Sequence, residues 1–388
     1  EAFAYCQSLK ELSIPDTVNQ MGKTAFYHCS GLHKIEISKK ISRIEDGTFI
    51  ECSGLEEVIL PQNLEEIGEE AFAYCQSLKE LSIPDTVEVI ENAAFRGCSS
   101  LKEVSLPQTL EVIGGGAFQK CTGLDTIVIP KGVNTIGEAV FGGCNLSTIS
   151  VAEENPVYDS RNNCNAIIKS DENRLILGCK TTEIPQGIAQ IGAYAFADCN
   201  QLVQISFPES VTYIGDHAFE DCIQLEGVVL PKGLTDIKSS AFRSCSSLQQ
   251  ITIPGSVKSI GAFAFAECRA LKQVSILEGV ETIEDCAFRM CSELSNISIP
   301  DSLTCILDNA FASCSLSNII LPEGLTEIGR YAFYYNPDLK NVAIPKGVVH
   351  IGDGVFDNSF NKVYVSRGSY AEEWAKKNMD KKNIMYWE

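Results

Sequence analysis

A phenylalanine marker recurs along this chain at a nearly constant interval and limits what the chain can fold into. The marker is usually Ala-Phe, twice Val-Phe and once Thr-Phe, and its phenylalanines stand at residues 3, 26, 49, 72, 95, 118, 141, 196, 219, 242, 265, 288, 311, 333 and 356. The step is 23 residues within the runs, with one step of 55 after residue 141 and one of 22 after residue 311. A fixed period of this length predicts an array of equivalent coils.

Each coil follows the pattern L-x-x-I-x-I-P-x-x-V-x-x-I-G-x-x-A-F-x-x-C-x-x, which we number from its leucine. Positions 4 and 6 are apolar and position 5 between them is not fixed as apolar. A short strand should therefore point positions 4 and 6 inward and position 5 outward. Proline at position 7 removes a backbone donor where the strand ends, and A-F-x-x-C suits a single helical turn that closes the coil. Because no coil buries its apolar face alone, equivalent residues of adjacent coils should stack in ladders.

The long step after residue 141 contains 32 extra residues, which we expect to form an irregular coil with a β-hairpin at about 151–183. Apolar runs at 165–169 and 174–178 flank the turn sequence SDEN. Pairing the residues directly beside that turn would place Cys164 opposite Cys179. A disulfide between these two cysteines is therefore one possibility, the other being free thiols.

The two ends of the array carry different signals. Glu1 stands in mid-coil, which predicts that the apolar ladder continues in a preceding segment. Near the other end, Ser369 and Glu372 form a capping box that begins a helix with one apolar stripe, made by Ala371, Trp374 and Ala375. We therefore expect one solenoid over residues 1–365 and a helical cap over residues 366–388.

Composition excludes several classes of function. The chain has 51 Asp and Glu against 31 Lys and Arg, a formal charge of −20 that repels the phosphates of nucleic acids. No apolar run approaches the ~20 residues of a membrane-spanning helix. With 45% apolar residues the chain can bury a core. Nucleic acid is not an expected partner, and the oligomeric state is left open.

Cysteine and histidine are arranged for packing and not for chemistry. Thirteen of the 17 cysteines follow the marker by three residues, a spacing unlike metal or redox motifs, and predict a buried ladder of free thiols. The four histidines are scattered, and the GGG run at 114–116 lacks the residues of a phosphate-binding loop. No nucleophile, base or metal-ligand set is present, so we expect no catalytic residue, no metal and no cofactor.

A binding site should then lie on the outward columns of the coils. Position 3 on the strand side changes from acidic to amide residues along the chain, and we take as candidates Glu57, Glu80, Glu103, Gln204, Gln250, Gln273, Asn296 and Asn318. A second group of candidates is aromatic or histidine, namely Tyr194, Tyr213, His217 and Phe263. The alternatives are that the charges form a solvated face and that the aromatic residues pack against the hairpin or the cap.

The sequence resembles the BspA-like leucine-rich repeat family of bacterial and protozoan surface proteins. The resemblance rests on I-P-x-x-V-x-x-I-G-x-x-A-F-x-x-C-x-x-L, as from Ile83 to Leu101, and covers nearly the whole chain. It implies a leucine-rich repeat solenoid, a curved right-handed array of coils of about 23 residues with a parallel β-sheet and short helical turns. Asn336 and Ser359 depart from the pattern by standing where cysteine is expected.

Two functions follow from these observations. The resemblance implies a secreted or cell-surface location and, for some members, adhesion to host matrix or plasma proteins or to other cells. We therefore expect a non-catalytic module that binds a protein ligand. The alternative is a structural spacer within a larger surface protein, because residues 1–18 repeat as residues 70–87 without a change, and copying coils lengthens a stalk without new contacts.

Overall fold

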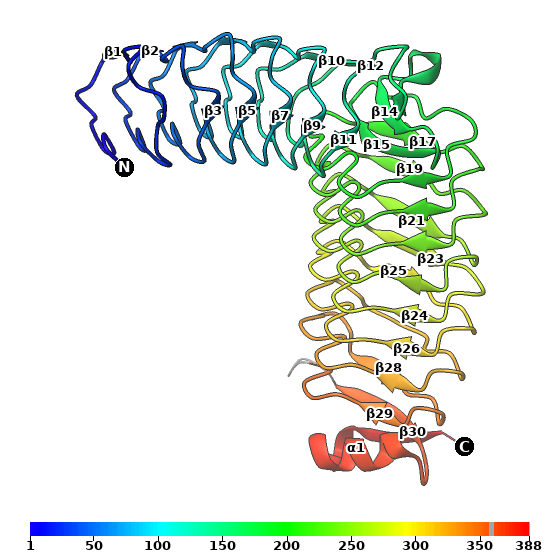
Figure 1. The fold of residues 1–388 in the computed structure, drawn as a ribbon. Helices are drawn as coiled ribbons and strands as arrows, with labels where there is room; N and C mark the ends of the chain where they lie inside the picture. Colours follow the sequence, from blue (N-terminus) through cyan, green and yellow to red (C-terminus); the bar gives the residue numbers. More distant parts are fainter. Residues whose placement is uncertain (357–360, 388) are drawn as a thin grey trace. The chain divides into compact units, whose positions relative to one another are not determined.

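The computed structural model describes residues 1–356 and 361–387, and the position of Ser359 lies outside them. The chain divides into two compact units. Unit 1 contains Glu1–Pro185 and Ala193–Cys199, and unit 2 contains Gln186–Gly192 and Asn200–Glu388. Within each unit, coils with parallel strands follow one another in chain order (Figure 1). This is the leucine-rich repeat solenoid that the period predicts.

The first strand of each coil occupies positions 3 to 5 or 3 to 6 of the pattern. In β10, Thr126 and Val128 are exposed whereas Ile127 and Ile129 are buried, as the alternation of apolar and polar residues predicts. These strands in unit 1 are β1 (Glu11–Ser13), β2 (Lys34–Glu36), β4 (Glu57–Ile59), β6 (Glu80–Ser82), β8 (Glu103–Ser105), β10 (Thr126–Ile129) and β12 (Thr148–Val151). Their pairing is parallel and in register, with Lys34 opposite Glu57.

A second, two-residue strand around position 13 forms another parallel column, which the sequence pattern did not predict. Each such strand ends on a buried or half-buried isoleucine that stacks on the same residue of the next coil. Because both sides of the coil carry strands, hydrogen bonds link adjacent coils at two places. In unit 1 the column consists of β3 (Arg43–Ile44), β5 (Glu66–Ile67), β7 (Val89–Ile90), β9 (Val112–Ile113) and β11 (Thr135–Ile136).

Unit 2 repeats both columns. Its first column consists of β17 (Gln204–Ser206), β19 (Gly227–Val229), β21 (Gln250–Ile253), β23 (Gln273–Ile276), β25 (Asn296–Ser298), β28 (Asn341–Ala343), β30 (Lys362–Ser366) and β31 (Ile384–Trp387). Its second column consists of β16 (Gln190–Ile191), β18 (Tyr213–Ile214), β20 (Asp236–Ile237), β22 (Ser259–Ile260), β24 (Thr282–Ile283), β26 (Cys305–Ile306), β27 (Glu327–Ile328) and β29 (His350–Ile351).

The segment from position 14 to the cysteine is a series of tight turns, so the expectation of a short helical turn is wrong in this detail. Glu70 and Tyr74, at positions 16 and 20, have φ angles of 53° and 61°. These two left-handed residues, four positions apart, reverse the chain and turn backbone N–H groups outward. The N–H of Phe72 therefore donates to the Ala94 carbonyl of the next coil at 2.7 Å, a bond that a helix would have kept internal.

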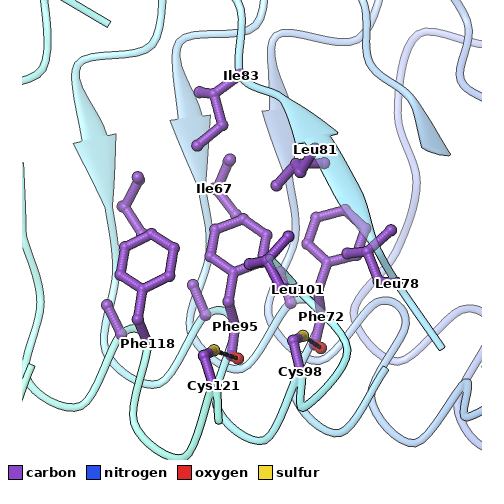
Figure 2. Packing of buried hydrophobic residues seen from close by; sticks show 14 of the residues in the cluster. Ile67, Phe72, Leu78, Leu81, Ile83, Phe95, Cys98, Leu101, Phe118 and Cys121 are labelled. Carbon is purple, nitrogen blue, oxygen red and sulfur yellow. Dashed lines mark hydrogen bonds between the residues drawn. The ribbon is translucent and has the colours of Figure 1, made fainter. Parts of the chain in front are cut away.

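Stacked phenylalanines form the centre of each unit. Neighbouring rings of the marker residues lie 5.1 to 5.4 Å apart from Phe3 to Phe141 and 5.0 to 5.8 Å apart from Phe219 to Phe356. Figure 2 shows the rings of Phe72, Phe95 and Phe118 in this ladder. Offset stacking adds to the area that each ring buries, so the ladder joins the coils laterally.

The extra residues of unit 1 form β13 (Tyr158–Asp159), the 3-10 turn η1 (Arg161–Asn163), β14 (Ala166–Lys169) and β15 (Arg174–Gly178). The hairpin is confirmed, but a bulge at Ile167/Ile168 shifts its register by one residue. The Cys179 thiol therefore faces the Asn165 carbonyl, at 3.5 Å, and not Cys164. The register expected for these two cysteines is wrong, and both thiols are free in the structure.

Helix α1 (Tyr370–Asn378) follows the last coil, where the capping box predicts a helix. Ser369 Oγ accepts from the Glu372 N–H at 3.1 Å, while the Glu372 carboxylate accepts from the Gly368 N–H at 2.7 Å. The hydrogen bond from Lys376, together with that from Gly368, lowers the pKa of Glu372 to about 2. After η2 (Lys381–Asn383), strand β31 pairs with β30, so the cap is a helix and a strand.

Candidate functional site

The strand face of unit 1 is acidic but partly neutralised. Glu57, Glu80 and Glu103 are exposed in β4, β6 and β8, as the sequence predicts. Lys34 forms an ion pair with Glu57 at 2.7 Å, and Lys79 pairs with the neighbouring Glu56 at 3.0 Å. Exposed pairs of this kind contribute little stability. A hollow of about 310 Å³ lies further along the face beside Val128, which is 58% exposed.

The strand face of unit 2 presents amides. The residues at position 3 of four coils, which begin strands β17, β21, β23 and β25, are exposed: Gln204, Gln250, Gln273 and Asn296. Asn318 is also exposed, but its coil has no first strand, so it does not lie in the strand column as expected.

A hollow of about 650 Å³ interrupts this face where position 3 is Gly227. Val229, two residues later in β19, is 82% exposed beside it. The lining residues are Gln204, Ile205, Ser206, Phe207, Glu209, Glu226, Gly227, Val228, Val229, Leu230, Pro231, Gln249 and Gln250. Sequence reasoning missed the hollow, although the glycine within a column of glutamines was a signal for it.

The aromatic candidates are not part of the strand face. Tyr194, His217 and Phe263 occupy the left-handed position 16 in the turns, with φ angles of 55° to 58°. Nδ1 of His217 lies 2.7 Å from Glu220, and Phe263 is 36% exposed. Tyr213 lies in β18, where the Lys238 ammonium stands 5.5 Å from its ring centre. Tyr194 belongs to unit 1 and the other three residues to unit 2.

The cysteine column has a structural role that its spacing did not reveal. The thiol of Cys98 donates to the Phe72 carbonyl at 3.2 Å, and that of Cys121 to the Phe95 carbonyl at 3.1 Å (Figure 2). The same bond, to the residue 26 positions earlier, recurs at Cys29, Cys52, Cys75, Cys144, Cys245, Cys268, Cys291 and Cys314. Each thiol thus adds a hydrogen bond between coils, to a carbonyl that also accepts a backbone N–H of its own coil, as Phe72 does from Cys75.

Burial keeps these thiols protonated. Desolvation raises the pKa of Cys52, Cys268 and Cys314 to about 12. The same cause raises the pKa of Cys75 and Cys121 well above the ordinary value. Because the thiolate is the nucleophile and the metal ligand, a protonated buried thiol can be neither. The column therefore contributes to the fold and not to a reactive centre.

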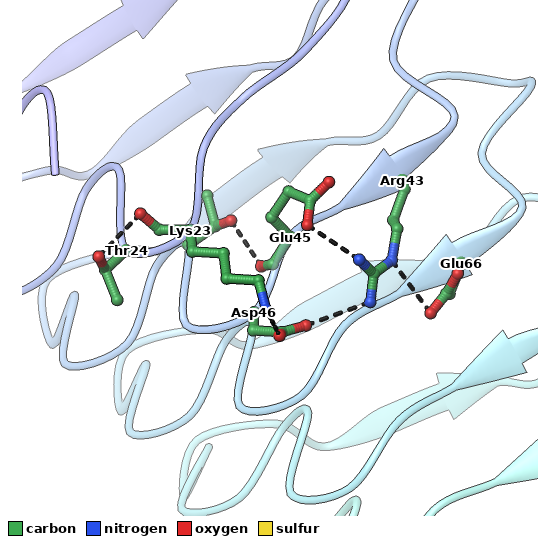
Figure 3. Close-up of polar contacts among 7 residues, drawn as sticks. Lys23, Thr24, Arg43, Glu45, Asp46 and Glu66 are labelled. Atoms are coloured by element: carbon green, nitrogen blue, oxygen red, sulfur yellow. Dashed lines mark hydrogen bonds and ion pairs between the residues drawn. The ribbon is translucent and has the colours of Figure 1, made fainter.

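A polar cluster on the second-strand side of unit 1 joins three coils (Figure 3). Arg43 contacts Glu45 at 2.9 Å, Asp46 at 3.2 Å and Glu66 at 3.0 Å. Lys23 reaches Asp46 at 2.6 Å, and its hydrogen bond lowers the pKa of that carboxyl. The two cations and three carboxylates of this cluster form ion pairs that link neighbouring coils laterally.

Within residues 1–356 and 361–387, no group of three or more His, Cys, Asp or Glu side chains could hold a metal ion. No helix of the described chain is long and apolar enough to span a membrane. The geometry that remains is a repeated face of exposed residues, which the hollows beside Val128 in unit 1 and Val229 in unit 2 interrupt. Such an extended exposed face can bind a partner.

The family model described as BspA type Leucine rich repeat region (6 copies) matches residues 1–102, 88–166, 176–277 and 258–373. The chain belongs to the BspA-type leucine-rich repeat family. No curated protein matches the chain.

Solved structures of bacterial leucine-rich repeat proteins are similar to this BspA-type chain. A leucine rich cell surface protein of Faecalibacterium prausnitzii A2-165 is 32% identical, with a TM-score of 0.68 over 76% of this chain and 81% of that one. A leucine-rich repeat protein of Eubacterium ventriosum is 25% identical, with a TM-score of 0.70 over 78% and 82%. One of Bacteroides ovatus is 28% identical, with a TM-score of 0.57 over 99% and 85%.

Asn336 replaces the BspA-type cysteine for a local reason. Its Nδ2 donates to the Phe311 carbonyl at 2.8 Å, as a cysteine would. Its Oδ1 accepts from the Leu316 N–H at 3.1 Å, in a coil that is one residue short between Cys314 and Leu316. In a full coil the leucine N–H donates to the cysteine carbonyl, as in Leu294 to Cys291. The asparagine thus supplies an acceptor that the deletion removed.

Proposed function

We propose that this chain is a secreted or cell-surface module that binds another protein through its strand face and performs no catalysis. The observation that carries the proposal is the strand face of unit 2, where exposed amides flank a hollow beside Val229, which is 82% exposed. Extended exposed faces are the usual binding surfaces of solenoid proteins.

The similarity to a Faecalibacterium protein described as a cell surface protein supports the location. The acidic net charge of −20 disfavours nucleic acid as the partner, and leucine-rich repeats most often bind proteins. Apolar groups surrounded by polar ones are typical of protein-binding patches, and Val229 among glutamines fits that description.

A titration of the full chain against immobilised matrix and plasma glycoproteins tests the proposal. The matched variant changes the strand-face amides Gln250, Gln273 and Asn296, together with the exposed Asn318 of the following coil, to lysine. We expect saturable binding that this variant loses, because four added charges disrupt the face without removing a buried group. A control variant adds four lysines at exposed turn positions, namely Gln62, Asn63, Gln76 and Gln224, and should bind as the parent does.

Equal loss in both variants would point to net charge and not to the strand face. Binding that survives the strand-face lysines would move the site elsewhere. If no partner binds, the result favours the spacer function, because a stalk needs length and no particular contact. A series that deletes whole coils then distinguishes the two functions, since a spacer scales with coil number whereas a binding module fails at one group of coils.

A further inference from the structure

The hollow of unit 2 lies where position 3 of the first strand column carries no side chain. Gly227 lies opposite Gln204 in the parallel pairing of β17 with β19, and the following sheet begins with Gln250 in β21. A Cβ atom built on Gly227 would meet no atom within 4 Å, and the φ angle of this residue is not positive. Backbone conformation therefore does not require a glycine here. A space of about 650 Å³ lies at this position, between Gln204 and Gln250.

Val229 and Phe207 are two of the apolar side chains that line the hollow among polar ones. Val229 has 82% of its surface exposed, the highest fraction among the exposed large apolar side chains of the described chain. Half-buried Phe207 also lines the space, and its ring packs edge-on against Phe219 at 5.7 Å. An aliphatic side chain of a partner that covers Val229 would remove apolar surface from water on both molecules.

Carboxylates stand at both ends of the hollow. Among its described lining residues the charged ones are Glu226, which precedes β19, and Glu209, which follows the Pro208 that ends the neighbouring strand. Neither forms an ion pair with another described residue. Each lies about three residues along the strand direction from Val229, on the order of 10 Å. A ligand with one cation on each side of an apolar group would complement this spacing.

The glutamine side chains beside the hollow offer hydrogen bonds to the backbone of an extended ligand. The side-chain amides of Gln204 and Gln250 are exposed and make no side-chain hydrogen bond within the described chain. A glutamine amide both donates and accepts, which is the pair of functions that a peptide backbone needs. The hollow beside Val128 in unit 1 is lined by one glutamine, Gln108, and one carboxylate, Glu103. It therefore lacks the glutamine and the carboxylate on both sides that the hollow of unit 2 has.

We propose that the hollow around Gly227 binds an extended peptide segment of the partner, with one aliphatic side chain over Val229 and a lysine or arginine about three residues to either side. This inference rests on the proposed protein-binding function and specifies the chemistry of the partner. The aliphatic group supplies apolar burial, the two cations meet Glu226 and Glu209, and the glutamines align the backbone.

The test selects short linear peptides from a random phage-displayed library against the full chain and measures the affinity of the selected synthetic peptides by fluorescence anisotropy. The blocking variant is Gly227→Gln, which restores the glutamine of the column and fills the hollow without backbone strain. Its control is Gly22→Gln in unit 1, another glycine whose Cβ would meet open space. The charge variant combines Glu209→Gln with Glu226→Gln.

We expect selected peptides to carry an aliphatic residue between basic ones and to bind Gly227→Gln about tenfold more weakly, with the control unchanged. The charge variant should lose affinity for the basic peptides and lose the salt dependence of binding. Neutral or acidic peptides, or equal affinity for Gly227→Gln, would overturn the proposal. If no peptide is selected but whole proteins bind and the strand-face lysines abolish that binding, the linear-segment inference fails while the proposed function stands.

Discussion

Residues 1–18 and 70–87 of unit 1 have the same sequence but different surroundings. Both copies form the same strand, β1 or β6, and both tyrosines take a positive φ, 63° at Tyr5 and 61° at Tyr74. Their burial differs, since Phe3 is 43% exposed and Phe72 is fully buried. The conformation of a coil is thus set by its own residues, whereas its burial is set by the coils on either side.

The strongest test of this contrast is alkaline pH, because it acts on every buried thiol at once. Burial raises the pKa of the column thiols from about 9 toward about 12 at Cys52 and Cys268. Between these pH values the unfolded chain binds fewer protons than the folded one. The contribution of the buried thiols to the free energy of unfolding is therefore fully present below about pH 9 and is lost as the pH rises. The melting temperature should therefore drop steadily above pH 9.

The measurement is thermal unfolding by circular dichroism at a series of pH values, with the thiolate absorbance of the folded and denatured chain followed in parallel. The denatured thiols should ionise first. A melting temperature that stays constant from pH 8 to 11 would show that the column thiols are accessible to solvent.

A substitution in the two identical copies gives the next largest effect. Phe72→Ala should cost about 3–5 kcal/mol, because it leaves a cavity between two stacked rings. Phe3→Ala should cost only about 1–2 kcal/mol, since Phe3 stacks on a single ring, that of Phe26. Urea denaturation of both variants measures the difference, and equal losses would show that neighbouring coils do not determine the contribution of the ring.

Asn336 tests whether one column position can need different residues in different coils. Asn336→Cys restores the repeat consensus but removes the acceptor of the buried Leu316 N–H, so we expect a loss of about 1–3 kcal/mol. Cys291→Asn, the reverse exchange in a full-length coil, should also destabilise, because it buries an amide oxygen with no free donor. Urea midpoints of the two variants decide the matter, and a stabilised Asn336→Cys variant would contradict the explanation by the short coil.

The smallest effect concerns the left-handed turn residue Glu70 of the second copy. Glu70→Gly should stabilise unit 1 by about 1 kcal/mol, because glycine takes the positive φ of position 16 without steric cost. Glu69→Gly, at the adjacent exposed residue with ordinary φ, should instead cost about 0.5–1 kcal/mol. Comparing the unfolding midpoints of this pair isolates the conformational cost, and a destabilised Glu70→Gly variant would disprove left-handed strain at this position.

The period of the sequence determined which residues would stack, because every buried position of one coil meets its own copy in the next. The tight turns could not be foreseen, since their left-handed residues include Glu70, Tyr74 and His217, which carry no glycine signal. The hydrogen bond of the cysteines has no sequence signature either. The bulge at Ile167 changed the partner of Cys179 because a single extra residue shifts a whole register.

Of the candidate site, the sequence predicted the exposed glutamines of unit 2 but not where among them a ligand could enter. Exposure follows from the alternation of one strand, whereas the hollow depends on what the neighbouring coils lack beside Gly227. The aromatic candidates were placed by column alone, and the structure puts three of them on turns and Tyr213 on a second-column strand.

Hydrogen bonds between successive coils at both the strands and the turns also determine how the array should respond to force. Because each coil is held only to its two neighbours, a chain pulled at its ends should lose one coil at a time from an end inward. Each released coil frees 23 residues, an extension of roughly 75–80 Å when fully drawn out. A protein anchored to a surface by such an array would yield in steps while the coils that hold its ligand stay folded.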